Sequence, residues 1–279
     1  MTLTVTTRTL LGNRRRSRTR WTAPGWLLVT VEVAVPILLV AWWWVASAGS
    51  TNAFFPPLQT ILERLVALVQ TPRFLLDVGS SLANLLVSFA LAAVLGVVLG
   101  VLLGLVKPLA WFVEPTLHFF RAIPPVALVP IFVSIIGFGT ETRILSITIA
   151  ALFPTLIATL DGVRSVDPTL LMVTRAYRIP RFARITRAIL PAAGPRIFSG
   201  LEVSLLTAFI VMIASEMLGS STGLGAATLL AQQSFMIADM WAGTLVLGVI
   251  GYAASALFAL FRRRVLRWYV SSQELEKQA

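Results

Sequence analysis

The sequence predicts an all-α, polytopic membrane protein with about six transmembrane helices, and three observations lead to that prediction. First, 57% of the 279 residues are hydrophobic and 13% are charged, whereas soluble domains carry about 25% charged residues. Second, several apolar stretches approach or exceed the roughly 20 residues that a helix needs to cross a bilayer. Third, basic residues are concentrated in alternate connections, which is typical of proteins whose orientation in the membrane is set by charge.

The predicted spans follow one another along most of the chain. They are expected at residues 26–48, 82–106, 119–136, 144–160, 198–218 and 241–261. The first span lies between "RRRSRTR" and "ASA", which is also typical of a cleavable signal peptide. Its apolar run is too long for such a peptide and contains Glu32 and Pro36, so a retained membrane helix is favoured.

Between the first two spans, the segment "FFPPLQTILERLVALVQTPRF" predicts a short amphipathic helix. Pro56 and Pro57 favour its start and Pro72 favours its end. The helix is too short to cross the membrane, so we expect it to lie on the outer surface as a packing cover for the bundle.

The second span carries glycine at four-residue spacing, at Gly96, Gly100 and Gly104. Glycine at this spacing allows two helices to approach closely in a membrane. The three residues therefore predict a tight helix-packing contact, either inside one subunit or between two subunits.

Positive charge predicts the orientation of the chain. Of the 23 Lys and Arg residues, 19 fall in the N-terminal segment, the second-to-third connection, the long connection after the fourth span, and the C-terminal end. The positive-inside rule then makes both termini cytoplasmic. We expect a basic cytoplasmic arm at 1–25, a membrane domain at 26–265 and a cytoplasmic tail at 266–279. The net charge of +11 is explained by orientation, so no nucleic-acid partner is expected.

The long connection contains "RAYRIPRFARITR" at 175–187, with an arginine at every third position. Three interpretations are open: a voltage-sensing helix of a channel component, orientation charge alone, or a docking surface for a cytoplasmic partner. Pro180 interrupts the row and no "TVGYG"-like filter is present, which argues against the sensor. The loop, about 162–191, also carries turn signals at "VDP" and "RIP". Two short helices joined by a turn favour the docking surface.

These segments resemble one family, the permease subunits of ATP-binding-cassette importers. "DPTLLMVTRAYRIPRFARITRAILPAAGPRIFSGL" is similar to the family's coupling loop, although Met172 stands at its glutamate position and Arg178 at its glycine position. "RAIPPVALVPIFVSIIGFG", "SEMLGSSTGLG" and "AFFPPLQTI" resemble the nitrate/sulfonate/taurine branch of the binding-protein-dependent type I permeases. An arginine would be strained at the turn glycine, and Pro180 offers another way to set the turn. The resemblance covers roughly residues 35–270.

The resemblance implies a type I importer fold with a cytoplasmic coupling helix-turn-helix, located in the cell membrane. It implies a second copy of the chain, two ATP-binding-cassette ATPase subunits and an external substrate-binding protein as partners, besides membrane lipid. The chain would be non-catalytic and without a cofactor, because ATP and Mg would be bound by the partner ATPase. The cargo would be a small polar solute such as a sulfonate, taurine or nitrate. The residues that would contact the ATPase are Arg175, Ala176, Tyr177, Arg178, Ile179, Pro180, Arg181 and Arg184.

The candidate substrate path rests on Glu216, Ser215, Arg121 and Pro125. An ionisable side chain at membrane depth is a functional candidate, and Glu216 precedes the glycine-rich "LGSSTGLG". A structural hydrogen bond from Glu216 to that loop is the open alternative. Prolines in the third span suit a bent or moving element.

Other classes of protein fit the sequence less well. A membrane-embedded enzyme would need paired carboxylates or a histidine site in its spans. The chain has no cysteine and a single histidine, His118, so no metal site is expected. A secondary transporter remains the alternative, but it would show two equivalent halves, and the arginine-rich connection occurs once.

Overall fold

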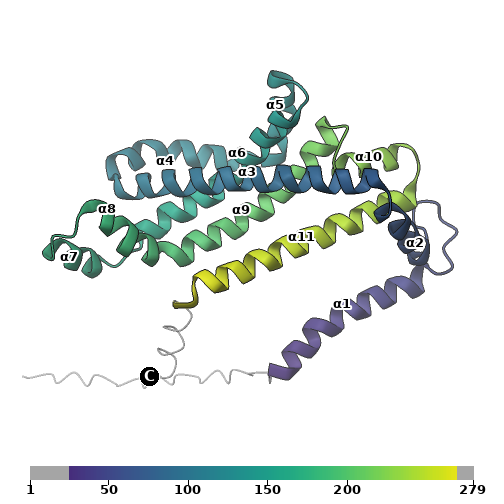
Figure 1. Cartoon of the computed structure of the whole chain (residues 1–279), viewed down its shortest axis with the longest axis horizontal. Coiled ribbons are helices and arrows are strands. Elements are labelled where there is room, and N and C mark those ends of the chain that lie inside the picture. The colour runs from purple at the N-terminus through teal and green to yellow at the C-terminus, as the bar shows by residue number, and fades with distance from the viewer. Residues whose placement is uncertain (1–24, 269–279) are drawn as a thin grey trace, which may run out of the picture.

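A computed structural model describes residues 25–268, with side chains from residue 34 onward. Most of the predicted N-terminal arm, the Glu32 side chain and most of the predicted tail lie outside these limits. All regular secondary structure within them is helical, as predicted (Figure 1). The elements are α1 (Gly25–Ser47), α2 (Leu58–Val69), α3 (Pro72–Leu105), α4 (Lys107–Ala122), η1 (Pro125–Ala127), α5 (Leu128–Ile136), α6 (Thr140–Arg164), α7 (Pro168–Ala176), α8 (Arg181–Arg184), η2 (Ile185–Ile189), α9 (Leu190–Gly219), α10 (Leu224–Gln233) and α11 (Ile237–Val265).

Four of the described helices, α3, α6, α9 and α11, are long and apolar enough to cross a membrane. The described part of α1, Ala34–Ser47, is a shorter apolar helix. A straight third span at 119–136 is not found. Instead, Lys107–Ala122 and Pro125–Ile136 pass the same test only together, and they meet at a bend of 83°. Pro124 and Pro125 cause the break, because proline removes a backbone donor and disfavours helix in the residue before it.

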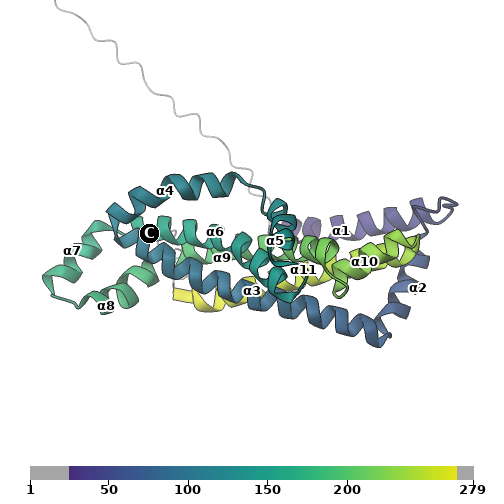
Figure 2. The ribbon, with the colours of Figure 1, turned by 90° about the horizontal axis from the view of Figure 1, so that it is seen from above.

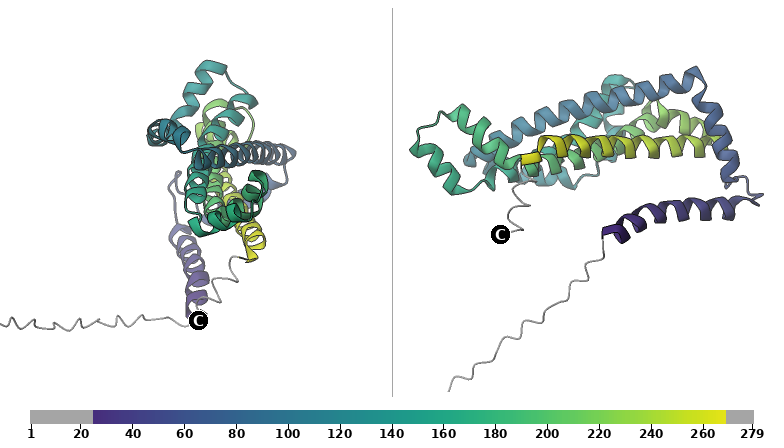
Figure 3. Two further views of the ribbon diagram at one scale, coloured as in Figure 1. Left: turned by 90° about the vertical axis from the view of Figure 1, so that its left-hand side faces the viewer. Right: turned by 60° about the horizontal axis from the view of Figure 1, so that its bottom comes forward.

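The core of the bundle is the layer formed by α3, α6 and α9, which lie side by side along its length (Figures 1 and 2). The two further views in Figure 3 show that α1 lies apart from this layer. The glycines of α3 lie directly against α6. A Cβ atom added to Gly96 would lie 2.8 Å from Thr155 Cβ, and one added to Gly100 would lie 2.5 Å from Thr159 Cβ. The glycine stripe therefore packs inside one chain, against a matching row of α6 residues.

The short helix α2 lies across one end of the bundle, far from α7 and α8 (Figure 1). Its buried residues Leu58 and Ile61 pack with Ala242 of α11. Arg64 donates two hydrogen bonds to Asp239 of α11, of 2.6 and 2.7 Å. A bidentate arginine–carboxylate pair is one of the stronger polar contacts, so α2 is held firmly on the bundle.

Two further ion pairs join the spans nearer the other end, where α7 and α8 lie. Arg164 of α6 pairs with Glu114 of α4. Arg262 of α11 pairs with Glu202 of α9. Glu202 is thus an acidic residue within a span whose charge is balanced by an arginine of a neighbouring helix.

Candidate functional site

The arginine-rich connection folds into a helical hairpin that extends beyond the end of the bundle (Figures 1 and 2). We call α7, α8 and the turn between them the arginine hairpin. Asp167 caps α7 by accepting a 2.7 Å hydrogen bond from the amide of Thr169, and Pro168 occupies the first turn. Both are favourable choices at a helix start, so the "VDP" signal marks the beginning of α7.

The turn of the hairpin closes through backbone hydrogen bonds. The amide of Ile179 donates to the carbonyl of Thr174 at 3.0 Å, and the amide of Arg178 donates to the carbonyl of Arg175 at 2.9 Å. This pair of bonds is the Schellman motif, which requires a left-handed residue after the helix. Arg178 is that residue, with a φ of 50°.

Arg178 therefore takes the conformation that glycine adopts without strain, at a cost of about 1–2 kcal/mol. Pro180 does not replace this left-handed turn. It follows the turn with a φ of −55° and begins α8. The hairpin thus has an arginine at its tightest point, where the backbone is strained.

The tip of the hairpin carries exposed aromatic side chains. Tyr177 and Phe182 each expose 79% of their surface. Arg175, Arg178 and Arg181 are exposed beside them. Sequence reasoning did not single out Phe182, although an aromatic residue between closely spaced arginines was a usable signal. Exposed aromatic and arginine side chains together are typical of the centre of a protein interface.

The hairpin is joined to the two central spans of the bundle. Residues 181–219 form one continuous helical stretch through α8, the π-helical η2 and α9. On the other side of the hairpin, Val163 at the end of α6 and Val166 just after it form a buried cluster with Ile189 of η2 and Ala193 of α9. A displacement of the hairpin would therefore act on α6 and α9 through packed side chains and continuous helix.

Two of the four candidate path residues line a cavity between the spans. Arg121 and Pro125 face a space of about 470 Å³ at the break between α4 and α5. Phe153 of α6 and Thr207 of α9 also line it. The bend in the third span thus places one cation, Arg121, beside a small cavity whose lining is otherwise mostly apolar but also includes the carboxylate Asp161.

Glu216 and Ser215 lie instead in the interior of the bundle. Glu216 is fully buried, and its Oε2 atom accepts hydrogen bonds of 2.9 Å from Ser81 Oγ and from the amide of Gly225. Gly223, with a φ of 108°, packs so closely that a Cβ there would lie 2.5 Å from the Glu216 carboxyl carbon. The glycine-rich loop is therefore folded over the Glu216 carboxylate. A role for Glu216 in the substrate path stays a prediction.

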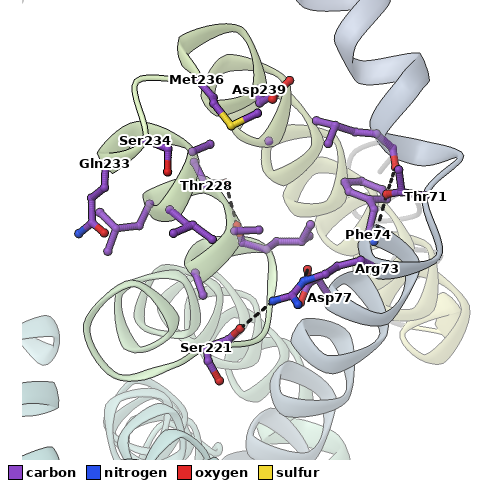
Figure 4. A pocket seen from close by; sticks show the side chains of 18 of the residues that line it. Thr71, Arg73, Phe74, Asp77, Ser221, Thr228, Gln233, Ser234, Met236 and Asp239 are labelled. Carbon is purple, nitrogen blue, oxygen red and sulfur yellow. Dashed lines mark hydrogen bonds and ion pairs between the residues drawn. The ribbon is translucent and has the colours of Figure 1, made fainter.

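The same loop borders a second cavity, of about 540 Å³, at the α2 end of the bundle (Figure 4). Arg73 donates a 3.3 Å hydrogen bond to the carbonyl of Ser221, and Asp77 accepts a 2.8 Å bond from the amide of Gly223. Asp77 was not found from the sequence, because it lies before the predicted start of the second span. It ties α3 to the loop beside Glu216.

The fold and these sites agree with known proteins. Residues 92–267 match the family described as "Binding-protein-dependent transport system inner membrane component". The chain belongs to this family. It is 31% identical over 252 residues to the putative aliphatic sulfonates transport permease protein SsuC of Bacillus subtilis (strain 168), which covers 88% of each chain. It is 26% identical to the taurine transport system permease protein TauC of Escherichia coli (strain K12), over 90% of this chain and 94% of TauC.

Solved permeases of ATP-binding-cassette importers share the architecture. A chain of the inward-facing MetNI methionine transporter matches with a TM-score of 0.59 and 21% identity, over 74% of this permease and 97% of that chain. A chain of a bacterial alginate transporter, solved with its periplasmic protein, matches with a TM-score of 0.60 and 17% identity, over 88% of this permease and 95% of that chain. The predicted type I importer permease fold is thereby confirmed.

Proposed function

We propose that this permease forms the membrane path of an ATP-driven importer and couples transport to ATP hydrolysis by a partner ATPase. The observation that carries the coupling role is the arginine hairpin. It extends from the bundle with exposed Tyr177 and Phe182, and it continues into the central span α9. A surface that is exposed, aromatic and cationic suits a partner that presents carboxylates around an apolar cleft.

The ATPase would bind ATP and Mg, and the permease would hydrolyse nothing itself. Closure of two ATPase subunits would move two hairpins, and α6 and α9 would transmit that motion to the cavity beside Arg121. This scheme needs two permease subunits, and we infer a second copy of the chain.

The solute class follows from the relatives. SsuC and TauC are named for aliphatic sulfonates and taurine, and NrtB of Synechocystis sp. (strain ATCC 27184 / PCC 6803 / Kazusa), 28% identical, is named for nitrate. Arg121 lines the cavity and supports an anionic group on the solute, since a guanidinium group binds anions through charge-assisted hydrogen bonds; the carboxylate Asp161 lines the same cavity. An external binding protein would deliver the solute at the α2 end.

The proposal is tested by uptake into vesicles that contain the permease and its ATPase. We expect uptake of taurine, an alkanesulfonate or nitrate only when ATP and the binding protein are both supplied. Arg121→Gln should reduce uptake of the anionic solute while leaving the complex assembled. Uptake that follows an ion gradient and ignores ATP would instead identify a secondary transporter.

The orientation gives a separate prediction. We propose that the hairpin end faces the cytoplasm, as the positive charge indicates. The chain contains no cysteine, so a single cysteine at the exposed Ser165 reports on one side alone. Ser165→Cys should resist an impermeant thiol reagent outside intact cells and react after lysis. Thr51→Cys, in the exposed connection between α1 and α2, is the matched control and should react in intact cells. The reverse pattern would invert the topology.

A further inference from the structure

A large cationic cavity lies between the arginine hairpin and the bundle; Arg175 and Arg181 of the hairpin line it, whereas Tyr177, Arg178 and Phe182 do not. Its volume is about 1140 Å³, and it lies between the hairpin, the start of α4 and the ends of α3 and α6. The basic side chains that line it are Lys107, Arg164, Arg175, Arg181 and Arg184. They come from α4, α6, α7 and α8, so the tertiary fold brings them together.

The charge in this cavity is not balanced. Glu114 also lines it, but this carboxylate pairs with Arg164. Within residues 34–268, no carboxylate lies within ion-pair distance of Lys107, Arg175 or Arg181. Like charges gathered around one space repel each other, and an anion placed between them would relieve that repulsion.

The side chain of Arg184 has a donor atom without an acceptor in the described part of the chain. The Nε atom of Arg184 is buried and has no hydrogen-bond partner among the residues that the structure describes, although Nη2 of the same side chain donates to the carbonyl of Ile179 at 3.3 Å. A buried donor without an acceptor is costly. Because the guanidinium group binds phosphate through two parallel hydrogen bonds, a phosphate oxygen is a suitable acceptor for such a group.

The surroundings of the cavity favour a lipid over a soluble anion. Trp111 lines the cavity and exposes 81% of its surface, and its neighbour Phe112 exposes 79%. Leu105 and Val106, at the end of α3, are also exposed and line the same space. Tryptophan beside basic residues at a span end is typical of the membrane interface, so charged and apolar groups meet here as they do in a phospholipid.

We propose that this cavity binds the headgroup of an anionic phospholipid, with its acyl chains against the apolar residues at the start of α4. Basic pockets between spans on the cytoplasmic side suit such headgroups. The lipid would hold the hairpin against α4, while Tyr177, Arg178 and Phe182, which lie outside the cavity, stay free for the ATPase. The proposal rests on the proposed function only for the side of the membrane that the cavity faces.

The test uses the purified full-length permease in detergent, without ATPase, ATP or solute. Binding of short-chain phosphatidylglycerol and phosphatidylcholine is measured by native mass spectrometry. We expect phosphatidylglycerol to bind more tightly, with the preference weakening as salt is added. The double variant Lys107→Gln/Arg181→Gln should bind phosphatidylglycerol roughly 25-fold more weakly, because each basic residue near an anionic lipid surface contributes about fivefold.

The matched control is Arg263→Gln/Arg264→Gln, which removes two exposed charges at the end of α11, outside the cavity. This control should keep the preference for phosphatidylglycerol over phosphatidylcholine. Lys107→Gln alone provides a milder cavity variant if the double variant does not fold.

Equal binding of both lipids, or equal losses in the two double variants, would overturn the proposal. Glycerol 3-phosphate binding as tightly as phosphatidylglycerol would assign the cavity to a soluble anion and also overturn it. A separate detergent pull-down with the ATPase completes the test: unchanged lipid binding in the cavity variants together with weakened ATPase binding would also overturn the proposal, because the cavity would then belong to the ATPase interface. None of these readouts depends on transport, so failure here leaves the proposed function untouched.

Discussion

Replacing Gly100 with leucine is expected to prevent the bundle from assembling. A Cβ atom at this position would lie 2.5 Å from Thr159 Cβ and 2.7 Å from the backbone carbonyl oxygen of Leu156. The carbonyl belongs to the α6 helix and cannot move aside alone, so α3 and α6 would have to separate. Overpacking of this kind costs about 3 kcal/mol or more. Detergent-purified Gly100→Leu protein should show low yield, aggregation on size-exclusion chromatography and a lower thermal midpoint.

Gly79 provides the matched control for this prediction. It lies on the same helix, but a Cβ there would meet no atom of the described part of the chain within 4 Å. Gly79→Leu should therefore be recovered with the yield and thermal midpoint of the parent protein. A monodisperse Gly100→Leu protein with an unchanged midpoint would show that the contact between α3 and α6 is looser than the structure indicates.

Changes at the hairpin tip are expected to separate the permease from its ATPase without unfolding it. Tyr177→Ala removes a side chain that is 79% exposed, and Arg178→Glu reverses a charge at the turn. Truncation of an anchor at the centre of an interface costs about 2 kcal/mol or more. Both variants should insert normally, lose the ATPase in detergent pull-down and lose solute-stimulated ATP hydrolysis.

Two further variants separate surface chemistry from backbone conformation. Tyr252→Ala on α11 removes an equally exposed tyrosine, 79%, away from the hairpin and should leave coupling intact. Arg178→Gly keeps the left-handed turn, because glycine adopts a positive φ freely, and should weaken ATPase binding less than Arg178→Glu. If Tyr177→Ala and Arg178→Glu both retain full coupled hydrolysis, the arginines serve only to orient the chain in the membrane.

The sequence by itself determined the features that depend on nearby residues. The all-helical fold, the apolar spans α6, α9 and α11 and the surface helix α2 could all be predicted, because hydropathy and helical periodicity are local properties. The helix-turn-helix of the arginine-rich connection was also predictable, from "VDP" and "RIP". Its closure by a left-handed residue at Arg178 follows the family register, although glycine is absent there.

Only the tertiary structure decided the features that join distant segments. The start of α3 was predicted ten residues late, because Asp77 and Ser81 are polar residues of the kind found in connections between spans. In the structure both side chains are buried under the glycine-rich loop. The glycine stripe predicted a close contact but not its partner α6. Ser81 is 135 residues from Glu216 in the chain, and four separate helices supply the basic residues behind the hairpin. Contacts between residues so far apart in the chain depend on how the helices pack, and local sequence patterns do not predict that packing.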